Sequence, residues 1–238
     1  MSTETTHNDA RVALITGASR GFGLAMARSL AADRWSLVID AREPGALDEA
    51  RDDLVQLTET RAIPGDVTDP VHREELVAAA RDLGGLDLLI NNASVLGPSP
   101  QPPLADYPLD VYRRVVEVNV IAPLALIQAS LSMLRQRHGT IVNITSDASW
   151  EAYAEWGGYG SSKAALNQLS RILEAEEEAI EVIWFDPGDM NTRMHQDAFP
   201  GEDISDRPPP EQSVPALVAL LNRGESGFHR AAEVLETR

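Results

Sequence analysis

The sequence predicts an α/β fold in which one doubly wound parallel β-sheet is flanked by helices on both faces. Short runs rich in Val, Ile and Leu alternate with amphipathic segments along the chain. The runs are apolar at nearly every position, as in strands that are buried on both faces. The first run ends in a glycine-rich turn that opens a helix. Such alternation gives parallel strands joined by crossover helices.

The elements follow one another in a regular order. Six strands are expected at 11–17, 36–41, 60–67 with a turn, 86–93, 139–146 and 181–188. Helices are expected at 21–34, 46–57, 71–84, 108–137, 158–179 and 213–222, the fourth after a proline-rich loop at 97–108. Gly84 is placed to end its helix.

One domain is expected from 11 to 238, preceded by a flexible N-terminal tail at 1–10. No internal repeat, interdomain linker or low-complexity tract divides the chain. The segment 189–212, which contains Pro200, Gly201 and Pro208–Pro210, is expected to be an irregular insertion. Loops of that length in compact domains are often lids.

Composition narrows the function. The apolar fraction of 43% and the charged fraction of 24% are those of a soluble globular protein. A formal net charge of −17 disfavours nucleic acid and anionic membranes as partners. The chain has no cysteine, and its five histidines form no ligand-like cluster, so we expect no disulfide, thiolate nucleophile or metal. The polar N-terminus and the lack of an uninterrupted apolar run long enough to span a bilayer favour a cytoplasmic protein.

The turn TGASRGFG (16–23) has glycines at 17, 21 and 23 between a strand and a helix. Glycine allows a tight turn and a close approach of the backbone to a pyrophosphate, and the helix N-terminus adds free N–H groups. This favours a Rossmann-like dinucleotide site. The spacing differs from G-x-G-x-x-G, so a turn that serves only close packing is the alternative.

The second strand ends in Asp40, with Arg42 two residues later. An acid here would accept hydrogen bonds from the ribose hydroxyls of NAD, whereas a base would pair with the 2′-phosphate of NADP. Arg20, inside the glycine loop, is a second cation for that phosphate. The alternative is that Arg42 is a solvated loop residue.

Four further residues point to chemistry. Tyr159 and Lys163 are spaced i, i+4 on one helix face, and an ammonium group beside a phenol lowers the phenol pKa. Ser146 ends a strand, where its hydroxyl could hold a carbonyl oxygen. Asn119 lies in an apolar helix, and a buried amide needs hydrogen-bond partners. Taken singly, each has a structural alternative: an ordinary helix start, a helix cap, and an amide that satisfies backbone carbonyls.

Together these residues resemble the short-chain dehydrogenase/reductase family, from about Arg11 to Leu221. The matching motifs, in order, are TGASRGFG (16–23), DV (66–67), NNA (91–93), Asn119, Ser146, YGSSK (159–163) and PGDMNT (187–192).

The resemblance implies an NAD(P)-dependent oxidoreductase that interconverts a ketone and a secondary alcohol by hydride transfer. Tyr159 would be the general acid or base, and Lys163 would lower its pKa and hold the nicotinamide ribose. Ser146 would orient the carbonyl, and Asn119 would anchor a water of a proton relay. The cofactor residues implied are Gly17, Ser19, Arg20, Gly21, Phe22, Gly23, Asp40, Arg42, Asp66, Val67, Asn92, Ala93, Ser94, Tyr159, Lys163, Pro187, Gly188, Met190 and Thr192.

The sequence departs from the family at two places. Ser94 stands where the family usually has glycine, so its side chain could crowd the cofactor or tighten the loop. Ala41 holds the place of the NAD-selecting acid and Arg42 that of the NADP-selecting arginine, while Asp40 comes one residue early. Together with Arg20, this register favours NADP(H) over NAD(H).

The substrate wall is expected from 94–107, 147–156 and 189–212, the last as a lid over substrate and cofactor. The candidate substrate residues are Ser146, Trp150, Tyr153, Trp156 and Met194. The aromatic residues could instead pack in the core or at a subunit interface. Asp147, Glu151 and Glu155 are expected to be solvated, although a basic substrate group could pair with one.

The apolar helix at 108–136 suggests burial on a second copy, and the resemblance implies a homodimer or homotetramer that pairs this helix and the Tyr159 helix. Packing within one domain is the alternative. Two other functions stay open: a redox-neutral epimerase or dehydratase that uses the same tyrosine, and a dinucleotide-sensing protein. Only an enzyme needs Asn119, Ser146, Tyr159 and Lys163 together.

Overall fold

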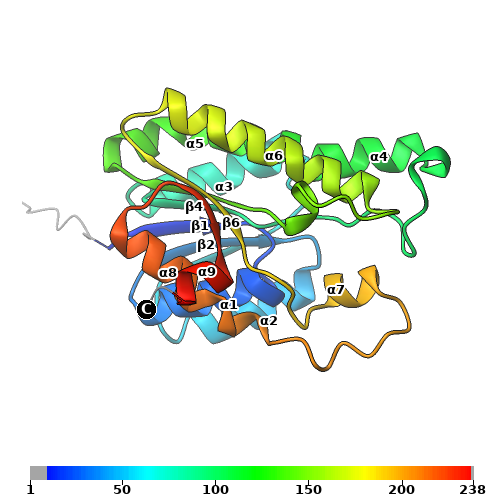
Figure 1. Ribbon diagram of the computed structural model, residues 1–238. Coiled ribbons are helices and arrows are strands. Elements are labelled where there is room, and N and C mark those ends of the chain that lie inside the picture. The colour runs from blue at the N-terminus through cyan, green and yellow to red at the C-terminus, as the bar shows by residue number, and fades with distance from the viewer. Residues whose placement is uncertain (1–9, 237–238) are drawn as a thin grey trace, which may run out of the picture.

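The computed structural model describes residues 10–236 and confirms the predicted fold class (Figure 1); the tail expected at 1–10 lies outside these residues, apart from Ala10. Parallel strands form one sheet in the order β3-β2-β1-β4-β5-β6-β7. The strands are β1 (Val12–Ile15), β2 (Ser36–Ala41), β3 (Thr60–Pro64), β4 (Leu88–Asn91), β5 (Thr140–Ile144), β6 (Glu181–Asp186) and β7 (Gly227–Arg230).

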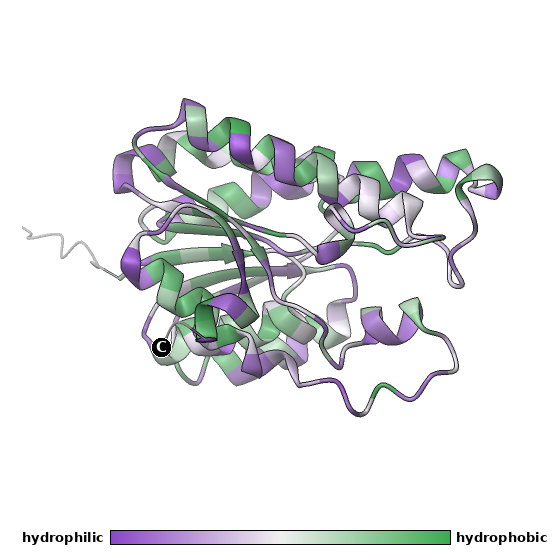
Figure 2. Ribbon diagram, viewed as in Figure 1, coloured by the Kyte–Doolittle hydropathy of each residue, from purple (hydrophilic) through white to green (hydrophobic). Residues whose placement is uncertain are grey.

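Helices cover both faces of the sheet (Figure 1). On one side lie α1 (Gly21–Ala32), α2 (Pro44–Leu54), α8 (Val214–Arg223) and α9 (Ala231–Glu236), and on the other α3 (Pro70–Asp82), α4 (Leu109–Val116), α5 (Ala122–Arg137) and α6 (Gly157–Glu176). Successive residues of β1 enter opposite cores: Ala13 and Ile15 pack on the α1 side, and Val12 and Leu14 on the α3 side. The central strands of the sheet are therefore mostly apolar, as Figure 2 shows, whereas the edge strands β3 and β7 also carry polar residues.

The strand order places a topological switch point next to β1. The chain leaves β1 toward β2 on one side, while β4 pairs with β1 on the other. Loops that follow β1 and β4 diverge there, and ligands of open α/β sheets bind in the resulting crevice at the carboxyl ends of the strands. The glycine loop and residues 92–95 lie at this place.

Three regions of the chain differ from the sequence-based expectation. The helix expected at 108–137 is interrupted by a π-helical turn, η2 (Glu117–Ile121), between α4 and α5. Strand β7 and helix α9 follow the last expected helix; β7 reads GFHR and has no apolar run that would identify it. The segment 189–212 is not wholly irregular, because it contains α7 (Arg193–Ala198) and a 3-10 turn, η4 (Pro210–Gln212). Two more such turns are η1 (Leu104–Asp106) and η3 (Asp147–Ser149).

The stretch Leu109–Arg137 is long and apolar enough to cross a membrane by length and composition, and no other helix within residues 10–236 meets that test. Half of its most apolar part is buried inside the protein, where the helix packs against α3 and α6. Core helices meet the same test, so this stretch is weak evidence for a membrane span.

Candidate active site

The glycine loop packs directly against the segment that follows β4. A Cβ at Gly17, whose φ is +66°, would lie 2.9 Å from the Ala93 Cα atom. A Cβ at Gly23 would lie 2.5 Å from Asn92 Nδ2 and 2.6 Å from the Gly17 carbonyl oxygen. Both positions therefore require glycine for close packing, which was the structural alternative for this motif.

Hydrogen bonds join the same two segments. Asn92 Nδ2 donates to the carbonyl oxygens of Thr16 (2.8 Å) and Gly17 (3.0 Å). The backbone N–H groups of Asn92 and Ala93 both donate to Thr16 Oγ1. The Asn92 side chain thus holds the loop in place, whereas the resemblance had placed it against the cofactor.

Helix α1 begins at this loop with its first turn free of side-chain capping. Its N-cap residue, Arg20, makes no capping hydrogen bond and pairs instead with Glu43. Free N–H groups and the helix dipole at such an end suit a phosphate. Phe22, expected among the cofactor residues, turns its side chain inward and stacks on Phe185 at 5.9 Å, so only its backbone faces the loop. Ser19 lies in the turn itself.

The expectation that Asp40 faces the cofactor is wrong. Its side chain is 1% exposed, and both oxygens have partners within the protein. Oδ1 accepts from the Gly17 N–H (2.7 Å), and Oδ2 lies 3.0 Å from His72 Nε2. Burial raises the pKa of Asp40, while the His72 and Gly17 hydrogen bonds lower it. Asp40 therefore fixes the glycine loop from behind, and Arg42 is the exposed residue at the end of β2.

Asp66 and Val67, expected at the adenine, follow β3. Asp66 accepts hydrogen bonds from Thr68 and forms an ion pair with Arg114 of α4. Val67 packs on Val118 of the π-helical turn. The segment after β3 is thus tied to α4 at the crevice.

Asn119, in the π-helical turn, uses its whole amide. Nδ2 donates to the Val95 carbonyl oxygen (2.9 Å) and to Ser162 Oγ (3.0 Å). Oδ1 accepts from the Val95 N–H (2.9 Å) and from Ser94 Oγ (3.1 Å). Ser94 therefore turns toward Asn119 and tightens its loop, one of the two effects expected where the family has glycine. With two donors and two lone pairs occupied, the amide connects the loop after β4 to α6.

Tyr159 and Lys163 lie on the buried face of α6. Lys163 Nζ donates to the Ile144 carbonyl oxygen at the end of β5 (2.8 Å) and lies 5.5 Å from the centre of the Tyr159 ring. The glycines around the tyrosine allow close packing: a Cβ at Gly158 would overlap the Tyr107 ring, and one at Gly160 would lie 2.6 Å from the Ala148 carbonyl oxygen. The helix start is thus adapted to hold the phenol inside the protein.

The pKa of Tyr159 is raised, whereas the sequence predicts that Lys163 lowers it. Burial raises the pKa of Tyr159, Asp186 and Asp147 raise it further, and hydrogen bonding with the hydroxyls of Ser146 and Ser94 lowers it. Burial alone lowers the pKa of Lys163 to about 7. The lysine does not lower the phenol pKa in the protein by itself, because both groups are desolvated and desolvation favours their neutral forms.

Two carboxylates raise the pKa of Tyr159 through their charges: Asp147, from the expected substrate wall, and Asp186, which was not expected at the site. Asp147 was expected to be solvated, but it accepts hydrogen bonds from Ser146 Oγ (2.9 Å) and from the Tyr153 hydroxyl (2.8 Å). Asp186, at the end of β6, is 7% exposed and accepts from the Gly188 N–H (2.9 Å). Burial raises the pKa of Asp186, and the charges of Asp147 and Asp189 add to the increase. An acid directly before Pro-Gly at a strand end was the available signal in the sequence.

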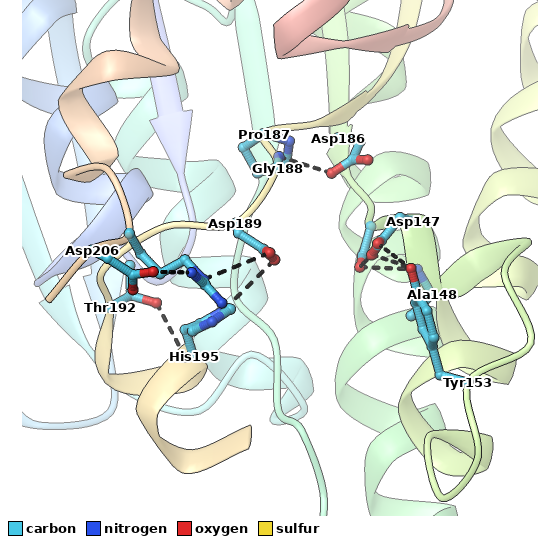
Figure 3. Close-up of polar contacts among 12 residues, drawn as sticks. Asp147, Ala148, Tyr153, Asp186, Pro187, Gly188, Asp189, Thr192, His195 and Asp206 are labelled. Atoms are coloured by element: carbon cyan, nitrogen blue, oxygen red, sulfur yellow. Dashed lines mark hydrogen bonds and ion pairs between the residues drawn. The ribbon is translucent and has the colours of Figure 1, made fainter. Parts of the chain in front are cut away.

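The segment after β6 supplies the opposite wall (Figure 3). Gly188 has a φ of +76°, and the Pro187 carbonyl oxygen accepts from Ser213 Oγ. Thr192 caps α7 and lies beside the glycine loop, 3.6 Å from where a Cβ of Gly21 would be. Met190, expected at the nicotinamide, packs instead on the hydrophobic core of the α1 face.

The predicted substrate residues separate into two groups. Trp156 and Met194 pack in one cluster with Tyr159, and the ring of Tyr153 packs edge-on against Trp156, with ring centroids 6.1 Å apart. Trp150 does not belong to this group, because its ring packs on Phe228 of β7 (4.8 Å) under the Arg230 guanidinium (4.5 Å). The packing alternative therefore holds for Trp150. Among residues 10–236, no group of three or more His, Asp or Glu side chains could hold a metal ion.

Comparisons with known proteins agree with this architecture. A family model described as short chain dehydrogenase matches residues 11–203. The rhamnolipids biosynthesis 3-oxoacyl-[acyl-carrier-protein] reductase of Pseudomonas aeruginosa is 35% identical over 193 residues, which are 77% of this chain and 74% of that protein.

Solved structures match as well. The KRED1-Pglu enzyme superposes with a TM-score of 0.83 at 29% identity, covering 92% of this chain and 100% of the other. An alcohol dehydrogenase from the archaeon Thermococcus sibiricus, complexed with 5-hydroxy-NADP, has a TM-score of 0.83 at 27% identity and covers 93% and 96% of the two chains. This chain belongs to the short-chain dehydrogenase family of oxidoreductases.

Proposed function

We propose that the protein is an NADP(H)-dependent oxidoreductase that interconverts a ketone and a secondary alcohol, with Tyr159 as general acid and base. One observation carries the proposal: the buried phenol of Tyr159 and the buried amine of Lys163 lie one helical turn apart on α6, and Lys163 Nζ donates to the carbonyl oxygen of Ile144, two residues before Ser146. A carbonyl oxygen placed between the serine and the tyrosine would meet two hydroxyl donors. Hydroxyl donors aimed at an oxygen that gains negative charge stabilise the transition state.

The residues at the switch point fit a dinucleotide. The first turn of α1 has no side-chain cap, so its free N–H groups can hold a pyrophosphate. Arg42 is exposed beyond the end of β2, and Lys163 brings an amine to the opposite side of the switch point. The T. sibiricus relative with its bound 5-hydroxy-NADP supports a nicotinamide cofactor of this kind.

When bound, the nicotinamide supplies or accepts the hydride. The protein chain positions the substrate carbonyl and donates the proton that the alkoxide needs. Ser146 donates its hydroxyl hydrogen to the carbonyl oxygen, and Tyr159, kept protonated by burial, gives its proton to the forming alkoxide. In the direction of oxidation, Tyr159 must first release its own proton, and the phenolate then takes the proton of the alcohol. Trp156 and Met194 pack beside Tyr159 and exclude water from it.

A tyrosine variant tests the proposal. Tyr159→Phe should bind the cofactor normally but reduce ketones about 10²- to 10⁴-fold more slowly, since it removes the proton donor. The control is Tyr112→Phe, which removes a hydroxyl that reaches only Ser161 on the surface of α4 and α6. Stoichiometric NADPH consumption by the wild type would separate a reductase from an epimerase or dehydratase. Full turnover by Tyr159→Phe would refute the proposal.

The cofactor preference is tested separately. With Asp40 buried, no acid in the expected NAD-selecting place competes with Arg42. We expect a higher kcat/KM with NADPH than with NADH, and Arg42→Ala should lower the NADPH value about tenfold or more by removing a charge-assisted hydrogen bond to the 2′-phosphate. Arg28→Ala, which removes an exposed arginine paired with Asp53, is the control. Equal or better catalysis with NADH by the wild type would contradict the NADP(H) preference.

A further inference from the structure

Asp147 directly follows Ser146, and both of its oxygens accept hydrogen bonds. Oδ1 accepts from Ser146 Oγ (2.9 Å) and from the Ala148 N–H (2.8 Å). Oδ2 accepts from the Tyr153 hydroxyl (2.8 Å), and Tyr153 is 47% exposed. Figure 3 shows Asp147 and Tyr153 on one side of the site, opposite Asp189 and His195. The carboxylate is therefore held in a defined position beside the serine that would bind the substrate carbonyl.

This contact competes with the proposed role of Ser146. A serine hydroxyl has one hydrogen to donate. While Ser146 donates it to Asp147, only oxygen lone pairs face a substrate carbonyl, and lone pairs repel the negative charge that develops there. Ser146 must turn to the substrate, and this turn leaves Asp147 Oδ1 with the Ala148 N–H alone.

The charge of Asp147 also opposes the reaction. Asp147 is one of two carboxylates whose charges raise the pKa of Tyr159, the other being Asp186. Proton transfer from the phenol to the substrate creates a phenolate near both carboxylates. A hydrogen-bond donor on the substrate that binds Asp147 would replace the bond lost from Ser146 and would reduce this repulsion.

We propose that Asp147 is a specificity-determining residue that selects ketones carrying a hydrogen-bond donor, a hydroxyl or an ammonium group, on the carbon next to the carbonyl. This inference rests on the proposed function. The spacing supports it, since Ser146 Oγ and Asp147 Oδ1 are 2.9 Å apart. A carbonyl oxygen on the serine and a donor on the aspartate would each need a bond of about 2.8 Å, and groups on neighbouring carbons are separated by a comparable distance.

The test compares three ketones of one carbon skeleton: the plain ketone, its α-hydroxy derivative and its α-ammonium derivative. The measured quantity is the ratio of kcat/KM for each donor-bearing ketone to that for the plain ketone, so that intrinsic reactivity cancels between variants. Asp147→Ala should lower both ratios about ten- to a hundredfold, as expected for loss of a hydrogen bond to a charged group. The loss should fall on the donor-bearing ketones, whereas the plain ketone should react as fast as with the wild type or faster, because Asp147 no longer takes the hydrogen of Ser146 Oγ.

Asp147→Asn distinguishes the two donors and keeps the size of the side chain if Asp147→Ala does not fold. An amide oxygen still accepts from a hydroxyl but carries no charge for an ammonium group, so only the ammonium ratio should fall strongly. Glu151→Gln, which removes an exposed carboxylate from the same segment, should leave both ratios unchanged.

Ratios in both Asp147 variants equal to those of the wild type would overturn the inference while leaving the proposed function in place. Absence of nicotinamide turnover with any ketone, in wild-type protein that binds the cofactor, would instead overturn the proposed function, and this inference with it.

Discussion

At the scale of single residues, burial controls the chemistry of the tyrosine and lysine. Their spacing correctly predicts that both lie on one face of a helix. It does not predict that this face is desolvated enough to raise the pKa of Tyr159 and to lower that of Lys163 to about 7. A protonated phenol suits the proposed general acid, and a buried amine without a carboxylate partner costs stability.

That cost leads to a prediction for Lys163→Met. Because the folded-state pKa of about 7 lies below the ordinary value of 10.5, the unfolded chain binds a proton between these pH values that the folded chain has released. Stability of the wild type therefore rises with pH across this window. The cost is largest at pH 6, where we expect Lys163→Met to be about 2–4 kcal/mol more stable once the lost hydrogen bond to Ile144 is included.

Urea unfolding of both proteins from pH 6 to pH 10 measures the effect. The advantage of Lys163→Met should shrink steadily as the pH rises above 7. Lys163 is the only lysine in the sequence, so no other lysine contributes to this dependence. A stability difference that stays constant over the whole range would contradict the assigned pKa.

The sequence predicts some of these residues well and others poorly. Ser146 and Tyr159 were identifiable because a strand end and a helix face are local features of the chain. The burial of Asp40 could not be predicted, since it depends on His72, which lies 32 residues away. Trp150 is a candidate substrate residue in the sequence because it is aromatic and close to Tyr159 along the chain. In the structure it packs on β7, a strand that the sequence did not reveal.

At the scale of elements, the segment after β6 is folded toward the site. Ser99 Oγ donates to the Asp197 carbonyl oxygen (2.6 Å), and Phe199 packs on Trp156 at 5.8 Å. At its base, Thr192 lies next to the glycine loop. The sequence predicted a lid here from the length and proline content of the segment, but missed α7, because six residues are too few to show a helical period.

We predict that NADP(H) binding slows amide hydrogen exchange in residues 193–199. A cofactor at the glycine loop would also contact Thr192, the N-cap of α7, so opening of the helix would have to break that contact as well. Exchange measured by mass spectrometry with and without NADPH checks this, with residues 126–137 of α5 as a reference away from the switch point. Unchanged exchange in 193–199 at saturating NADPH would count against a lid that closes on the cofactor.

At the scale of the whole molecule, the long helix that contains the π-helical turn contacts the candidate site on its inner face and exposes apolar side chains on its outer face. Asn119 faces inward to the loop after β4, whereas Ile121, the last residue of the same turn and the N-cap of α5, is 45% exposed. On the neighbouring helix α6, Ile172 is 44% exposed. The sequence predicted surplus apolar surface on this helix, but not which part of it the sheet would bury, since that depends on how α5 and α6 pack together.

We predict that the protein forms a homodimer or homotetramer through the outer faces of α5 and α6. Apolar side chains exposed on adjacent helices favour association because their burial removes them from water. Ile121→Glu and Ile172→Glu should therefore shift the protein toward monomers, because each places a charge in the buried interface.

The control is Val55→Glu: Val55 is equally exposed (44%) but follows α2 on the opposite side of the sheet. Light scattering after size-exclusion chromatography measures the mass in solution. A monomeric wild type, or an assembly that Ile121→Glu and Ile172→Glu leave intact, would show that these faces do not mediate association.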